Sequence, residues 1–196
     1  IVSLFGFHDA PEAEKGFQWL MKNRQNDGGW AIPYRTVEKK IFENRYKKKS
    51  SHNDKNDPIK LEKAKPFSNV VTGMVLRALA ASPYWREHKE TKKAGSLLIS
   101  EFFKADHYSD QKSAAGWKDL SYPFWGTNIL SSLDSLSKIG FSPENEFIQP
   151  ALQWLLRRQK PQGYWEARFK KAELEDHLWI TTAVLRMLKG FDLIES

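Results

Sequence analysis

The stretch "KGFQWLMKNRQNDGGW", Lys15 to Trp30, returns near the end of the chain as "PALQWLLRRQKPQGYW", Pro150 to Trp165. Each copy carries Gln-Trp-Leu, a second Gln shortly after it, and a Gly-containing turn that closes on Trp. A pattern that recurs in this way indicates an internal repeat, and a repeat decides the architecture of the whole chain. We therefore read the rest of the sequence as copies of one unit.

A second helical pattern follows each turn. The segments "GMVLRAL", "TNILSSL" and "TAVLRML" align without gaps when Gly73, Thr127 and Thr182 share one register. Apolar residues recur in all three at the spacing of a helix face. The middle unit has a degenerate first helix, in which Leu97 takes the position of the Trp in Gln-Trp-Leu, and its Trp117 comes late. The chain is thus predicted to hold three helical hairpins.

Start and stop residues support these assignments. Asp9 and Pro11 suit the first turn of a helix, and Gly140 suits a left-handed residue just beyond the end of one. The periodicity predicts six helices in all. They are expected from Asp9 to Asp27, over 68–82, over 84–103, over 122–139, from Pro150 onward, and over 175–188. The expected fold class is all-α.

The repeated stretches resemble the QW repeat of the terpenoid-cyclase and protein-prenyltransferase superfamily. The matching positions are Lys15, Gly16, Trp19, Leu20, Gln25, Gly28 and Trp30, and then Ala151, Trp154, Leu155, Gln159, Gly163 and Trp165, where the Gln is shifted by one residue. The part of the chain from Trp117 onward looks closest to uncharacterised bacterial and archaeal squalene-cyclase-like proteins. The resemblance implies a partial α/α toroid of about three outer/inner hairpins, with a single domain over residues 1–196. It also implies that Gln and Trp clamp one helix to the next.

Composition limits the classes of function. The chain has 196 residues, no Cys and a net charge of +7. Eleven Lys and Arg against five Asp and Glu lie between Arg35 and Lys65, so most of the excess charge belongs to this one polar segment. We expect residues 35–65 to form a mobile, solvated insertion. Binding of nucleic acid, through the run Lys47 to Lys49, is the less favoured interpretation.

The residues that carry chemistry in the resembled family are absent at the corresponding positions. Its protonating cyclases place Asp-x-Asp-Asp before a Thr-Ala pair, but here Ile180 and Thr181 precede Thr182. The acidic cluster "ELED" lies four residues too early, and we expect Asp176 or Glu175 to cap a helix. The zinc site of prenyltransferases needs a Cys, and the five His show no metal-binding spacing. We expect no metal site and no cofactor.

Aromatic residues remain as candidates for a binding site. Several aromatic residues, with polar residues beside them, lie at the starts of the expected inner helices. In a toroid these helix starts lie together at one end of the ring. Aromatic faces suit an apolar ligand, although ordinary core packing is the favoured explanation for aromatic residues at helix starts. Asp134 adds a carboxylate that faces either the ring interior or solvent. The candidate ligand-binding residues are Phe67, Asn69, Tyr122, Trp125, Asn128, Asp176, His177 and Trp179.

Two classes of function fit this pattern. The first is a non-catalytic, squalene-cyclase/prenyltransferase-like domain that binds an apolar, isoprenoid-like molecule, and the second is a helical-repeat scaffold that docks a protein partner. An enzyme of the terpene-cyclase or prenyltransferase type, with a non-standard acid site or completed by further sequence, is the alternative. No apolar run is long enough for a membrane span, and no signal peptide opens the chain, so we expect a cytoplasmic location. Oligomerisation stays open.

Overall fold

The computed structural model describes residues 10–36, 60–108, 113–124, 126–168 and 172–195. Every regular element in these ranges is a helix, and no strand occurs among them, which confirms the all-α prediction. The α-helices are α1 (Pro11–Lys22), α2 (Pro33–Thr36), α4 (Asn69–Ala80), α5 (Pro83–Glu87), α6 (Lys89–Ser100), α7 (Ile129–Ile139), α8 (Ile148–Leu156) and α9 (Leu174–Gly190). A 3-10 helix spans Ala114–Lys118.

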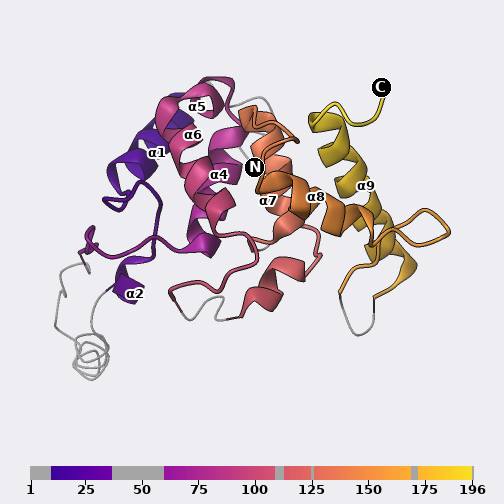
Figure 1. Ribbon diagram of the computed structural model, residues 1–196. Helices are drawn as coiled ribbons and strands as arrows, with labels where there is room; N and C mark the ends of the chain where they lie inside the picture. The colour runs from indigo at the N-terminus through magenta and orange to yellow at the C-terminus, as the bar shows by residue number, and fades with distance from the viewer. Residues whose placement is uncertain (1–9, 37–59, 109–112, 125, 169–171, 196) are drawn as a thin grey trace, which may run out of the picture.

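Helix α7 forms the centre of the packing. It lies between α4 and α9, and α6 and α8 also pack against it (Figure 1). All of its residues except Lys138 are buried. Figure 1 shows the chain progressing from α1 through α4 and α7 to α9 across the molecule. The expected inner helices α4, α7 and α9 are therefore consecutive neighbours, while closure of such an arrangement into a toroid stays a prediction.

Small residues set the close approach of these helices. A Cβ atom added to Gly73 of α4 would lie 2.3 Å from Cγ2 of Thr127, just ahead of α7. One added to Gly190 of α9 would lie 2.5 Å from the hydroxyl of Ser137. Both distances are too short for a side chain, so Gly is required for this spacing. Gly73 and Thr127, which the sequence alignment places in one register, are thus in direct contact.

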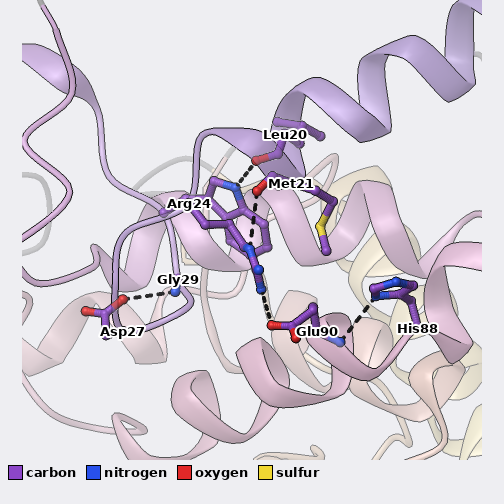
Figure 2. Close-up of polar contacts among 8 residues, drawn as sticks. Leu20, Met21, Arg24, Asp27, Gly29, His88 and Glu90 are labelled. Atoms are coloured by element: carbon purple, nitrogen blue, oxygen red, sulfur yellow. Dashed lines mark hydrogen bonds and ion pairs between the residues drawn. The ribbon is translucent and has the colours of Figure 1, made fainter.

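Each predicted hairpin is tied by the indole N–H of its tryptophan. In Trp30, Nε1 donates to the carbonyl of Leu20 near the end of α1, at 2.7 Å (Figure 2). In Trp165, Nε1 donates to Leu155 near the end of α8, at 2.8 Å. Trp117 of the degenerate middle unit does the same to Lys104, just beyond α6, at 2.7 Å. Carbonyls in the last turn of a helix lack their regular donor four residues later. In α1 and α8 each indole adds a donor to a carbonyl that also accepts from the backbone N–H three residues later.

Trp30 and Trp165 are also bound to the helices that follow their turns, α4 and α9. The backbone N–H of Trp30 donates to the hydroxyl of Thr72 in α4, at 2.9 Å. That of Trp165 donates to the hydroxyl of Thr181 in α9, at 3.0 Å. Thr72 and Thr181 immediately precede the aligned positions of "GMVLRAL" and "TAVLRML". The repeat found in the sequence is therefore repeated in hydrogen bonds.

The glutamines behave differently from the expected clamp. The turn residues Gly28 and Gly163 have φ angles of +107° and +93°, which favour Gly, and their N–H groups donate to Gln25 and Lys160. The structural counterpart of Gln25 is therefore Lys160 and not Gln159. The Gln25 amide donates to the carbonyls of residues 62 and 65, whereas the Gln159 amide donates to Gly163. The tryptophan, and not the glutamine, makes the repeated tie.

Several helix boundaries differ from the predicted ones. The expected helix over 84–103 is two helices, because His88 has extended backbone and caps α6 with its side chain. The expected helix over 122–139 begins only at Ile129, because Asn128 accepts from the N–H of Ser131 and caps α7. Helix α8 begins two residues before Pro150, which still lies within its first turn.

The other two ends need smaller corrections. The N-cap of α1 is Ala10, whereas the expected cap, Asp9, lies outside the described residues. Helix α9 runs from Leu174 to Gly190, slightly beyond the expected 175–188 at both ends. Asp176 accepts a hydrogen bond from the N–H of Glu173 at 2.9 Å, so the predicted capping role of this carboxylate is confirmed.

Both ends of the basic segment are packed. Thr36 is buried, and its hydroxyl accepts a hydrogen bond from the N–H of Glu62. The backbone carbonyl of Lys63 accepts from Asn26, and its side chain donates to the carbonyl of Lys22. These contacts attach the residues before α4 to the first Gly-Trp turn. Residues 37–59, where most of the predicted mobile insertion falls, lie outside the described residues.

Replacement of Trp165 tests how much this tryptophan contributes to the stability of the fold. Trp165 is 2% exposed. We expect Trp165→Ala to lower the free energy of unfolding by about 3–5 kcal/mol, because it leaves a large cavity and removes the indole donor of the Leu155 carbonyl. Trp165→Phe should cost less, since it keeps most of the packing. Trp19, at 64% exposure, is the control, and Trp19→Ala should cost less than about 1 kcal/mol. Urea titration measures all three, and equal costs for Trp165→Ala and Trp19→Ala would contradict the repeat.

The threonine contact has its own test. Thr72→Val keeps the shape of the side chain but removes the acceptor of the buried Trp30 N–H. We expect a loss of about 1–3 kcal/mol in the free energy of unfolding, because a buried donor is left without a partner. Thr182→Val, at an exposed position of α9, is the matched control and should change stability by less than about 0.5 kcal/mol. Indistinguishable midpoints in urea for the two variants would mean that the hydroxyl is dispensable.

Candidate functional site

Helices α4, α7 and α9 contribute to the lining of a groove of about 420 Å³. Helix α4 forms one wall, α7 lies at the base, α9 contributes Arg186, and the segment before α7 closes one end. Its apolar lining consists of Met74, Ala78, Ala81, Tyr122, Pro123 and Phe124. Its charged lining consists of Arg77, Asp134, Lys138 and Arg186. We call this site the inner groove.

A buried carboxylate organises the charged half of the inner groove. Asp134 is 2% exposed. One of its oxygens accepts from Nζ of Lys138 at 2.7 Å, and the other accepts from Nε of Arg186 at 3.2 Å. An unpaired buried carboxylate would be costly, so these two cations account for its burial. The sequence left open whether Asp134 faces solvent, and the structure places it in the groove.

Arg77 brings a third cation from the opposite wall. Its guanidinium donates to the carbonyl of Gly126 at 3.1 Å and lies 5.7 Å from the ring centre of Phe124. Burial lowers the pKa of Arg77, and the negative charge of Asp134 acts in the opposite direction. The groove thus holds three cationic side chains around one carboxylate, which leaves a positive excess next to an apolar wall.

Two of the predicted aromatic residues meet beside this groove. The rings of Tyr122 and Trp179 are stacked, with centres 5.6 Å apart and planes at 15°. Phe124 packs edge-on against Tyr122 at 5.1 Å. Trp179 is 48% exposed and donates from Nε1 to Glu175, so it extends the aromatic wall toward solvent. The expected contact at Trp125 lies outside the described residues.

Three other predicted site residues, Phe67, Asn69 and Asn128, lie away from the inner groove. Phe67 is buried and lies against Gly29 of the first turn. Asn69, at the start of α4, is fully buried, and neither atom of its amide has a hydrogen-bond partner among the described residues. Asn128 caps α7 and also donates to the carbonyl of Asp119 at 2.7 Å. None of the three lines the groove.

The pair Asp176 and His177 also serves the fold. Asp176 caps α9, as described above. Nδ1 of His177 accepts a hydrogen bond from the N–H of Ala167 at 3.1 Å, and its ring stacks on Tyr164 at 5.4 Å. Both contacts attach the second Gly-Trp turn to α9. Of the candidate residues in the described ranges, only Tyr122 lines the groove directly.

Sequence reasoning missed the three cations of the inner groove. A signal for two of them was nevertheless present, because Arg77 and Arg186 hold the same position in the aligned segments "GMVLRAL" and "TAVLRML". Inner helices in one register direct equivalent residues toward a common interior. Lys138 had a weaker signal, as the residue four positions after Asp134, a spacing that brings two side chains together on a helix.

Within the described ranges, no group of three or more His, Asp or Glu side chains is placed to hold a metal ion. None of the helices in those ranges is both long and apolar enough to cross a membrane. A comparison of the chain with protein-family models, curated proteins and solved structures finds no match.

Proposed function

We propose that this chain is a non-catalytic helical-repeat binding domain, similar to squalene-cyclase and prenyltransferase domains, and that its inner groove binds an apolar, isoprenoid-like ligand. The observation that carries the proposal is that apolar and cationic side chains line the same groove, and we propose that they form an apolar half and a cationic half. Tyr122, Phe124 and Met74 offer contact for a hydrocarbon body. Arg77, Lys138 and Arg186 offer hydrogen bonds for an oxygen-bearing end.

The volume and composition of the groove support this type of ligand. Ligand sites in proteins measure roughly 300–1,000 Å³ and combine apolar walls with a few polar groups. The inner groove, at about 420 Å³, lies in that range. A protein partner is the other occupant expected from the sequence. A groove of this size would accept only a single side chain or a short segment of such a partner, so the small ligand is the better fit.

The same geometry argues against cyclase chemistry. Addition of a proton to an alkene needs a carboxylic acid that is held protonated and directed into a dry cavity. Asp134 is the one carboxylate of the groove lining, and cationic donors occupy both of its oxygens. This arrangement suits a carboxylate that holds two cations in place. It does not suit an acid that donates a proton.

Two ligands that share one hydrocarbon chain test the proposed division of the groove. We expect the domain to bind both farnesol and farnesoate in calorimetric titrations. Tyr122→Ala should weaken both, because it removes part of the apolar wall. Arg77→Gln should weaken farnesoate by about tenfold and farnesol by less than about twofold, since only the carboxylate forms a charge-assisted hydrogen bond. Tyr84→Ala, at an exposed position of α5, is the control for a lost aromatic ring.

The outcomes separate the hypotheses. Equal weakening of the two ligands by Arg77→Gln would refute the assignment of a cationic half. Absence of binding for both ligands to the folded domain would refute the small-ligand function. In that case the protein-partner interpretation would be preferred.

Incubation with substrates tests the non-catalytic character. We expect no cyclised or transferred product from squalene or farnesyl diphosphate, with or without Mg²⁺, in mass analysis of extracts, because cationic donors occupy both oxygens of the Asp134 carboxylate in the groove. A product that disappears with Asp134→Asn would instead favour the enzyme alternative and identify a non-standard acid. A product that disappears with Asp176→Asn would assign that role to the "ELED" cluster.

A further inference from the structure

A second cavity, of about 310 Å³, lies at the C-terminal end of α8, apart from the inner groove. Three segments enclose it: residues 118–120, residues 154–160, and residues 166–168 after the second Gly-Trp turn. Among the described residues, five cationic side chains and a single carboxylate, Glu166, line it. We call it the basic cavity. The cations are Lys118, Arg157, Arg158, Lys160 and Arg168.

Only two of these five cations are neutralised within the described residues. Lys160 pairs with Glu166 at 2.7 Å, and Arg168 pairs with Asp119. Among the same residues, Lys118, Arg157 and Arg158 form no ion pair. Like charges that converge on a concave surface raise its potential, and low-dielectric walls concentrate the field on an incoming anion.

The helix end alone does not account for this cluster. Cations near a helix C-terminus complement the helix dipole, and Arg157 and Arg158 directly follow α8. However, the last carbonyls of α8 already have donors. The N–H groups of residues 157, 158 and 159 donate to the carbonyls of residues 153, 155 and 156, and the indole of Trp165 also donates to residue 155. Lys118 and Arg168 come from other segments of the chain.

Aromatic rings hold two of the free cations in place. The guanidinium of Arg158 lies 4.9 Å from the ring centre of half-buried Trp154, and Nζ of Lys118 lies 6.0 Å from that of Phe103. Trp154 and Phe103 in turn pack edge to face at 6.0 Å. A guanidinium stacked on a ring keeps its N–H donors at the edge, where they are free for another partner. The cavity is therefore partly preorganised before any ligand arrives.

We propose that the basic cavity binds a small molecule through two or more linked phosphate groups. Phosphate oxygens match the forked donors of arginine, and linked phosphates carry enough charge to balance three unpaired cations. The volume, close to the lower end of the usual range for ligand sites, fits a diphosphate with little else attached. The chemistry is shared by inorganic diphosphate and by the diphosphate of a small organic molecule.

The test uses inorganic diphosphate as the probe, in calorimetric titrations of the whole chain at low ionic strength. We expect one saturable site per chain. The double variant Arg157→Gln/Arg158→Gln should weaken binding by about tenfold or more, because it removes two charge-assisted donors. The control, Lys15→Gln/Lys89→Gln, removes the same net charge at exposed positions elsewhere and should change affinity by less than about threefold. Circular dichroism establishes that each variant is folded.

Further titrations define the class of molecule that binds. Tighter binding of adenosine diphosphate than of inorganic diphosphate would place the phosphates on an organic molecule, and equal affinity would favour the inorganic ion. Arg77→Gln, in the inner groove, should leave diphosphate binding unchanged. The proposal is overturned if the folded chain fails to bind diphosphate, if the control weakens binding as much as the cavity variant does, or if only a single-stranded oligonucleotide binds.

Discussion

The hydrogen bonds of the tryptophan at the end of each Gly-Trp turn are the contacts on which the rest of the structure depends. The indole of Trp30 or Trp165 satisfies a carbonyl of the helix before the turn, and its backbone N–H binds a threonine of the inner helix after it. One residue thus fixes the end of one helix, the turn and the start of the helix that follows. The large buried ring makes this arrangement costly to break.

Placement of the inner helices in a common register produces the groove. Gly73 allows α4 to approach the segment before α7, and Gly190 allows α9 to approach Ser137. With those spacings fixed, equivalent positions on α4 and α9 face the same interior, and Arg77 and Arg186 enter it from opposite walls. Asp134 on α7 lies between them and binds Arg186 directly. The charged half of the groove is therefore a consequence of the repeat.

The sequence predicted the helices better than it predicted the site. Apolar periodicity predicted the all-α fold and the approximate positions of most helices, because burial of a helix face leaves a regular apolar pattern in the sequence. Boundaries at His88 and Asn128 were missed, since each depends on one side chain that caps a helix. Aromatic residues at helix starts indicated only the wall around Tyr122. The cations were missed because a charged residue on a helix is usually solvated, and only the packing of three helices places these side chains in one groove.

The two cavities also show how one repeat can produce two kinds of site. In the inner groove a buried carboxylate binds Lys138 and Arg186, so the cations are held in fixed positions and much of their charge is balanced. In the basic cavity aromatic rings, and not a carboxylate, hold Arg158 and Lys118, so their charge is left available to a ligand. The inner groove is therefore suited to recognise a ligand by its shape and apolar surface, and the basic cavity is suited to recognise one by its negative charge. Two chemically different ligands could therefore bind this chain without competing for the same residues.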